Sequence, residues 1–335
     1  DTKVTFYKSG RTVKTVTKTV NIIADEYNIA PIVATFPVVY FSLNLNKITE
    51  KADGTPVPTI VSLQRPDAYN WDKLPENVYW QPNLTKLQVQ TQTNFDTKTN
   101  KMADYVKTLV QANPNAKFNL YINDAYSKYI LRLLVANGVP ESNFHVFLLS
   151  DGSGSYAKFK EAFNNDNPQA TYDAQKTGWE NAVADSAANK KQDLSRATGY
   201  SSSRYATMLA NEYENIEWWV ARKTDTFVSP NTAFVDKYIK TSARVIAQNM
   251  NTMLTALSEE QKVEFKALYN FNNQMFAKAD QEHKKVMMIL GSRANATSEP
   301  DFRSYAKFLM KHYGNDYVYY YKGHPATPTG VNPDK

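Results

Sequence analysis

The chain alternates between short continuous apolar runs and longer stretches in which apolar residues recur at helical spacing. Residues 117–122 and 144–149 are apolar runs of strand length, and the segment between them, AYSKYILRLLVAN, carries apolar side chains every three to four residues. Gly138 follows this segment, where a glycine commonly ends a helix. A strand, a helix and a strand with short connections predict a right-handed βαβ crossover with parallel strands.

The same order of elements recurs near the end of the chain. Residues 286–290 form an apolar run, a predicted helix covers 301–313, and a second strand covers 316–321. Gly314 follows the helix as a predicted C-cap. One face of this helix is expected to be buried and consists of Phe302, Tyr305, Ala306, Leu309 and Tyr313.

The rest of the chain has less regular patterns. The run TFPVVYFSLNLN at 35–46 is almost continuously apolar, which predicts a strand buried on both faces. Alternating valines in residues 1–25 predict a half-exposed antiparallel strand, and the spacing in 156–280 predicts a block of helices in which Trp218 and Trp219 belong to the core. These helices are expected at 175–190, 203–222, 231–257 and 258–280, and further short strands at 60–63, 78–80 and 84–90.

Two loops occupy equivalent places in the two βαβ units. SDGSGS at 150–155 follows the second strand of the first unit, and KGHP at 322–325 follows the second strand of the second unit. In open α/β sheets, ligands bind beyond the carboxyl ends of the strands. Two such units facing each other across a cleft would bring Asp151 and His324 onto one ligand. This is the layout of a two-domain glycosyltransferase.

Candidate residues follow both strands of the first βαβ unit and the first strand of the second unit. Asp151 is either a turn residue, because Asp-Gly is a common turn dipeptide, or a carboxylate that accepts a proton from a sugar hydroxyl. Asn123 and Asp124 are typical helix N-cap residues, and Asn123 is also placed to bind a sugar hydroxyl. Gly291 and Ser292 open a loop whose backbone N–H groups could approach an anion.

The loop that contains His324 combines positive charge with an open backbone. Lys322 and His324 donate hydrogen bonds when charged, Gly323 lets the backbone come close to a ligand, and Pro325 stiffens the exit. The pattern predicts a cradle for a phosphate leaving group. The alternative interpretation is a loop histidine held by a backbone carbonyl.

Composition narrows the class of function without selecting one. The 335 residues are 42% hydrophobic, enough for a large core and two domains. The net charge is +6, and Lys and Arg are spread along the chain, which argues against a nucleic-acid binder and is compatible with an anionic substrate such as a sugar nucleotide. The absence of cysteine excludes disulfides and thiolate chemistry, and no apolar run is long enough to span a membrane.

Composition and sequence motifs also give expectations for the location of the protein and for its cofactors. Abundant Asn, Thr and Tyr favour an exported or cell-surface bacterial protein, with the cytoplasm as the alternative, and a chain that begins at Asp1 without methionine is typical of a processed protein. The sequence has no Walker A, GxGxxG or HExxH motif, no paired-histidine spacing and no convincing DxD loop. We therefore expect a reaction without a metal or other cofactor.

The ordered pair SDGS and KGHP resembles the acidic-Asp-Gly and His-Pro motifs of bacterial sialyltransferases, most closely those of glycosyltransferase family 80. LSEEQKVEFKALYNFN at 257–272 resembles a helix of that family, and so do the segments VMMILGS and FNLYINDAYSKYIL. The similarity covers residues 115–325 with gaps. Ser150 stands where the family has the first of two acidic residues, and the family's tryptophan after its Gly-Thr segment has no counterpart here.

The resemblance implies a GT-B fold and transfer of sialic acid from CMP-sialic acid to a glycan hydroxyl, with inversion and without a metal. It implies that Asp151 is the general base and that His324, with Lys322 nearby, assists departure of the CMP phosphate. It also implies a set of residues that bind donor or acceptor, which are Asn123, Gly152, Ser153, Gly291, Ser292, Lys322, Gly323 and Pro325.

The resemblance further implies a domain organisation. We expect residues 1–30 to be a β-strand extension or the tail of an immunoglobulin-like domain, 31–280 to be a Rossmann-like domain with a helical insertion, and 281–335 to begin a nucleotide-binding domain whose remainder would follow Lys335. Two other functions fit the same fold, because function resides in the site. One is a GT-B transferase with another nucleotide sugar, and the other is a non-catalytic cell-surface protein that binds glycans.

Overall fold

The computed structural model describes residues 24–64, 69–75, 77–80, 92–190, 202–290 and 299–322. The chain separates into two compact units, unit 1 (Asp1–Tyr269) and unit 2 (Asn270–Lys335). Within the described ranges, every helix is too short or too polar to cross a lipid bilayer.

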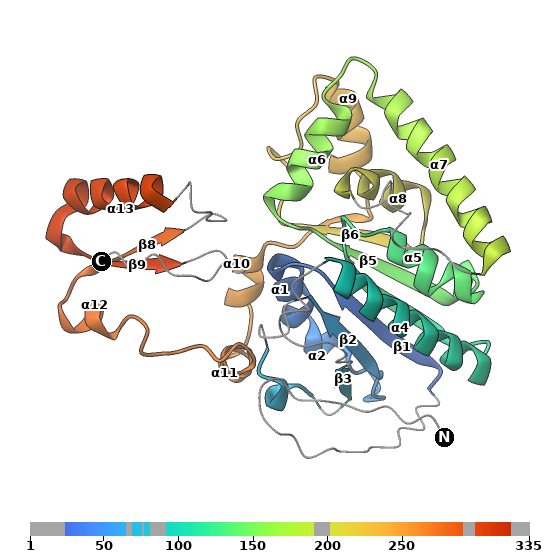
Figure 1. Ribbon diagram of the computed structural model, residues 1–335, viewed down its shortest axis with the longest axis horizontal. Coiled ribbons are helices and arrows are strands. Elements are labelled where there is room, and N and C mark those ends of the chain that lie inside the picture. The colour runs from blue at the N-terminus through green and yellow to red at the C-terminus, as the bar shows by residue number, and fades with distance from the viewer. Residues whose placement is uncertain are drawn as a thin grey trace. The chain divides into compact units, whose positions relative to one another are not determined.

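Unit 1 is built on a seven-stranded sheet in which every pairing is parallel (Figure 1). The strand order is β3-β2-β1-β4-β5-β6-β7. The order changes direction at β1 and β4, which is where open α/β sheets commonly bind ligands. The strands are β1 (Glu26–Ile32), β2 (Thr59–Leu63), β3 (Val78–Trp80), β4 (Lys117–Asn123), β5 (Phe144–Leu149), β6 (Ile216–Val220) and β7 (Val245–Ala247).

Helices cover both faces of this sheet. On one face, buried side chains of α4 to α9 pack against strand residues such as Phe118, Leu148 and Trp218. On the other face, α1 packs against Ala30 and Leu149. The described helices of unit 1 are α1 (Thr35–Leu43), α2 (Leu45–Ile48), α4 (Gln92–Ala112), α5 (Lys128–Leu133), α6 (Ser153–Phe163), α7 (Pro168–Asn189), α8 (Ala206–Glu212), α9 (Thr232–Val235), α10 (Met250–Thr255) and α11 (Glu259–Leu268), with short turns that include η2 (Trp71–Lys73) and η6 (Ser203–Tyr205).

The predicted strand at 35–46 is wrong, because this run forms α1. Periodicity cannot distinguish a buried strand from a helix whose sides are nearly all buried, and most of α1 is buried. The central strand is instead β1, of which six of seven residues are buried. Residues 26–30 therefore belong to the sheet and not to an N-terminal extension, while residues 1–23 lie outside the described part.

The predicted helical block in 156–280 is also wrong in part. The range 203–222 contains strand β6, and the range 231–257 contains strand β7, which extend the parallel sheet. The run IEWWV can satisfy either pattern, and pairing with β5 decides for a strand. Trp218 and Trp219 are buried, as predicted for core residues.

Two predicted helix-end signals are confirmed and a third is wrong. Ser258 and Gln261 form a capping box at the start of α11, and Gly138 ends its segment in the left-handed region at φ 75°. The predicted N-cap role of Asn123 and Asp124 is wrong. Helix α5 begins only at Lys128, Asn123 accepts from the N–H of Ala125, and Asp124 accepts from Ser155.

Unit 2 contains the predicted second βαβ arrangement. Strands β8 (Lys285–Leu290) and β9 (Tyr317–Lys322) pair in parallel and are connected by α13 (Glu299–Tyr313), while α12 (Ala277–Gln281) precedes them. Ala306 of α13 is buried as expected, but Tyr305 is 55% exposed and Tyr313 44% exposed. A two-stranded sheet is too narrow to cover the whole apolar face of a helix, so the prediction for these tyrosines is wrong.

Candidate functional site

Two aspartates lie at the carboxyl edge of the sheet in unit 1. The backbone N–H of Asp124, just after β4, donates to the carbonyl of Leu149 at 2.9 Å. The backbone N–H of Ser150, just after β5, donates to the carbonyl of Trp219 at 3.0 Å. The ladder thus continues beyond the strands, and it places Asp124 and Asp151 at neighbouring strand ends, as the sequence predicted.

The Asp151 turn is a sharp connection between β5 and α6. Gly152 is buried, with φ 66° and ψ −127°, a backbone region that residues with a Cβ avoid. A Cβ at this position would also lie 3.6 Å from the ring of Phe36 on α1. The turn therefore depends on glycine for its backbone conformation, and α6 begins immediately afterwards at Ser153.

Serine hydroxyls hold the backbone of this turn. The Oγ atom of Ser155 accepts a hydrogen bond from the N–H of Asp151 and another from the hydroxyl of Ser150, each at 2.9 Å. The Oγ atom of Ser150 in turn accepts from the N–H of Gly152 at 3.2 Å. Two buried side chains thus fix the two backbone amides on either side of the Asp151 carboxylate.

The Asp151 side chain is half-buried and lies over the first turn of α6. Its Oδ2 atom is 3.7 Å from the position that a Cβ on Gly154 would occupy. The N-terminus of a helix carries partial positive charge, which stabilises a carboxylate. Ser153, the first residue of α6, is exposed beside it. The carboxylate is therefore held in a defined place and is still accessible from solvent.

Asp124 is fully buried behind this turn and accepts three hydrogen bonds from described residues. Ser155 and Ser203 donate through their hydroxyls at 2.6 Å each, and the indole N–H of Trp218 donates at 2.9 Å. Burial raises the pKa of Asp124 to about 6, the hydrogen bonds oppose this rise, and repulsion from Asp151 adds to it. The carboxylate links β4, β6, η6 and the start of α6.

Asn123 lies at the same edge but is 1% exposed. Its Oδ1 atom accepts from the N–H of Ala125 at 2.7 Å, and its Nδ2 atom donates to the carbonyl of Val33 at 3.2 Å. The side chain thus ties the end of β4 to the end of β1. These two bonds give it a structural role in unit 1.

The remaining predicted residues belong to unit 2 or to parts that are not described. Lys322 is exposed at the end of β9 and pairs with Leu290, the last residue of β8, so both strands end at one edge. The predicted residues that follow these strands directly in sequence lie outside the described residues, and they are Gly291, Ser292, Gly323, His324 and Pro325.

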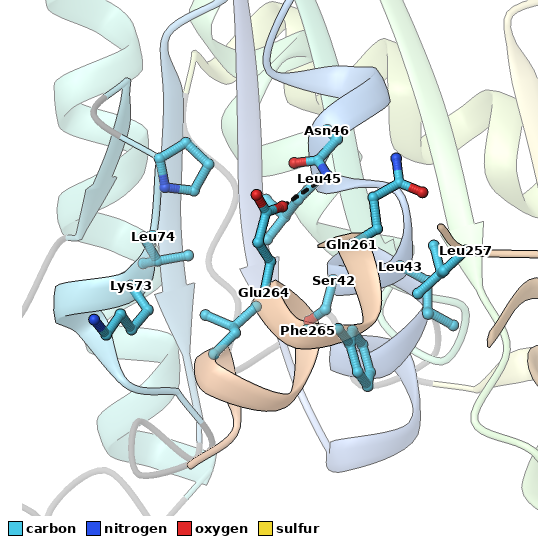
Figure 2. A pocket seen from close by; sticks show the side chains of 12 residues that line it. Ser42, Leu43, Leu45, Asn46, Lys73, Leu74, Leu257, Gln261, Glu264 and Phe265 are labelled. Atoms are coloured by element: carbon cyan, nitrogen blue, oxygen red, sulfur yellow. Dashed lines mark hydrogen bonds between the residues drawn. The ribbon is translucent and has the colours of Figure 1, made fainter. Parts of the chain in front are cut away.

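A separate cavity of ≈ 280 Å³ lies in unit 1 among α1, α2, η2 and α11 (Figure 2). Figure 2 shows Asn46 of α2 beside Glu264 of α11, and the amide nitrogen of Asn46 donates to the Glu264 carboxylate at 3.5 Å. Ser42 lines the cavity and bonds to the hydroxyl of Tyr269 at 2.7 Å. None of the predicted site residues lines this cavity, so it is not part of the candidate site.

Sequence reasoning missed the polar network around Asp124. Ser203 lies 79 residues further along the chain, and Trp218 lies 94 residues further, so no local pattern connects them to Asp124. One signal was available, because Asp124 directly follows an apolar strand at the same sheet edge as Asp151. A buried acid at such an edge is a candidate for a role in the site.

Solved structures of three bacterial sialyltransferases share the fold of this chain. An α/β-galactoside α-2,3-sialyltransferase from the luminous marine bacterium Photobacterium phosphoreum aligns with a TM-score of 0.62 at 12% identity, covering 90% of this chain and 75% of its own. A 2,6-sialyltransferase from Photobacterium sp. JT-ISH-224, solved with the donor product CMP and the acceptor substrate lactose, aligns with a TM-score of 0.68 at 15% identity, covering 90% and 59%.

A sialyltransferase from Photobacterium damsela aligns with a TM-score of 0.64 at 15% identity, covering 91% of this chain and 62% of its own. The chain thus spans between 59% and 75% of the length of these structures. No protein-family model matches the sequence, and no curated protein matches it significantly. At these identities the likeness establishes a sialyltransferase-type fold.

Proposed function

We propose that this protein is a glycosyltransferase of the sialyltransferase type that transfers sialic acid from CMP-sialic acid to a glycan hydroxyl. One observation carries the proposal. Asp151, a half-buried carboxylate, sits on a glycine-dependent turn at the carboxyl edge of a parallel sheet, within a fold that solved sialyltransferases share. This edge is where the fold class binds its ligands.

The proposed reaction requires a base for the acceptor hydroxyl and positive charge that stabilises the departing phosphate. Asp151 accepts the proton of the acceptor hydroxyl, and the oxygen attacks the anomeric carbon as the bond to the CMP phosphate oxygen breaks. Attack opposite the leaving group inverts the anomeric centre. His324 and Lys322 stabilise the negative charge that develops on the departing phosphate, so the reaction needs no metal.

The test is a transfer assay on the natural protein at its full length, with CMP-sialic acid and a panel of galactose-terminated acceptors. Asp151→Ala and His324→Ala are each expected to lower kcat/KM by about 10²–10⁴-fold. Asp166→Ala, an exposed aspartate beyond the other end of α6, is the matched control and is expected to retain activity. Full activity in both active-site variants would refute the assigned roles.

Separate measurements test the identity of the donor and the mechanism. CMP is expected to raise the melting temperature more than UDP or GDP, and preference for either of the latter would indicate another nucleotide sugar. Chelation by EDTA is expected to leave the rate unchanged, and NMR of the product is expected to show the inverted anomer. Glycan binding without nucleotide binding would identify a non-catalytic protein instead.

A further inference from the structure

The network behind the Asp151 turn has a defined direction, because its members differ in what they can donate. The indole N–H of Trp218 can only donate, and an ionised carboxylate can only accept. Ser155 has one hydroxyl proton, and it is directed to Asp124 at 2.6 Å. The lone pairs of Ser155 are therefore left to accept from the N–H of Asp151 and from Ser150.

We propose that Asp124 is a positioning residue for Asp151: its carboxylate sets the hydrogen-bond direction of Ser155, which holds the Asp151 turn, and its negative charge strengthens Asp151 as a proton acceptor. The proposal rests on the function proposed above. Asp124 itself is 0% exposed, so it offers no accessible surface to a substrate. It acts through Ser155 and through the field that it creates at the neighbouring strand end.

Stability alone does not require a carboxylate at this position. An asparagine could direct its oxygen to Ser155 and Trp218 and its amide nitrogen to Ser203, whose hydroxyl can turn to accept. Such a side chain would keep a hydrogen bond to each of the three partners without the cost of burying a charge. An acid that is costly to bury and replaceable by a neutral isostere is consistent with a role for its charge.

Among the described residues, two tyrosines interact electrostatically with the pair, and neither carries a charge. Tyr40 on α1 faces Asp124, and Tyr126 faces Asp151; burial raises the pKa of both hydroxyls, to about 12 for Tyr126, so both stay neutral at physiological pH. Asp96, which also faces Tyr126, is paired with Lys128 at 3.4 Å. The repulsion between Asp124 and Asp151 is thus an interaction between two acids at adjacent strand ends.

The coupling can be measured without any turnover, by ¹³C NMR titration of selectively labelled aspartate in the full-length protein. If the two charges interact, the ionisation of Asp124 near pH 6 will also shift the Asp151 carboxyl signal. In Asp151→Asn, the midpoint of Asp124 is expected to fall by roughly 0.5–1 unit. Glu217→Gln, which removes an acid from the opposite face of β6, is the control and is expected to leave this midpoint unchanged.

The kinetic readout separates the coupling from a purely structural role. The pH profile of kcat/KM for the wild type is expected to rise a second time near pH 6, as Asp124 ionises. The Asp124→Asn variant is expected to lack this second rise, and its kcat/KM at neutral pH is expected to be about threefold lower. An Asp124 midpoint that is identical in wild type and Asp151→Asn would overturn the inference. If the midpoint shifts but the wild type transfers no sialic acid, the coupling stands and the proposed function fails.

Discussion

The hydroxyl of Ser155 donates to the buried carboxylate of Asp124 at 2.6 Å and thereby joins the ends of two adjacent strands. Ser155 belongs to the first turn of α6, whereas Asp124 directly follows β4. Because Ser155 also accepts from the N–H of Asp151, one side chain connects the proposed base to a fully buried acid.

Ser155→Ala should destabilise unit 1. The variant removes one of the three donors to Asp124 and the acceptor for the Asp151 N–H, and a hydrogen bond to a buried charged group is worth about 1.5–3 kcal/mol. Ser153→Ala, two residues earlier and exposed, is the control and should change the free energy of unfolding by less than about 0.5 kcal/mol. Urea denaturation measures both, and equal effects would mean that the network does not stabilise the fold.

The stability of the protein should carry a pH dependence that originates at Asp124. Its pKa is about 6 in the folded state, above the ordinary value of 3.8. Between these values the folded state binds more protons than the unfolded state, so the contribution of this group to the free energy of unfolding falls as pH rises. Below pH 3.8 and above pH 6 the contribution is constant, and the whole change is on the order of 3 kcal/mol.

Comparing wild type with Asp124→Asn isolates the contribution of this group. Other acids change the free energy of unfolding in the opposite direction, because the pKa of Glu26 and of Glu212 is lowered in the folded state. The stability of the variant relative to wild type should rise between pH 4 and pH 6 and then level off. At pH 7 the variant should be at least as stable as wild type. Denaturation curves that differ by the same amount at every pH would contradict the assignment.

Gly152→Ala should cost more stability than Gly138→Ala, although both glycines have positive φ. Gly138 has φ 75° and ψ 21°, the left-handed region that other residues visit at a cost of about 1 kcal/mol. Gly152 has φ 66° and ψ −127°, a region nearly closed to residues with a Cβ, so we expect about 1–3 kcal/mol. The melting temperatures of the two variants give the comparison. A smaller loss at Gly152 would show that the turn can relax.

Tyr40→Phe should stabilise the protein. The Tyr40 hydroxyl is buried and has no hydrogen-bond partner among the described residues, and such a group costs about 1–3 kcal/mol. Tyr129→Phe is the matched control, because Tyr129 is equally buried but donates to Asp96 at 3.1 Å. Thermal unfolding should show a higher midpoint for the first variant and a lower one for the second. A loss in both would indicate that the Tyr40 hydroxyl has a partner after all.

Much of the candidate site at the carboxyl edge of the sheet could be predicted from sequence, because the sequence signals for its strands and turns are local. The apolar run 144–149 followed by Asp-Gly predicts a strand and a turn at its carboxyl end, and the structure confirms β5 and the Asp151 turn. The capping box at Ser258 and the βαβ arrangement of unit 2 are confirmed for the same reason. Each signal depends on residues within a few positions of one another.

Elements buried on nearly all sides could not be assigned in this way. The run 35–43 and the strand Ile216–Val220 are both almost continuously apolar, yet the first is a helix and the second a strand. A fully buried element shows no polar face, so its period is hidden. Packing against β1 and pairing with β5 decide the outcome, and both are long-range interactions.

The sequence by itself determined which residues end the strands, and therefore that Asp124 and Asp151 lie at the carboxyl edge of a parallel sheet. The tertiary structure decided their different environments. Ser203 and Trp218 come from distant parts of the chain to enclose Asp124, whereas the Asp151 carboxylate remains half-buried over the start of α6. Burial and hydrogen-bond partners depend on neighbours in space, and chain order alone does not specify them.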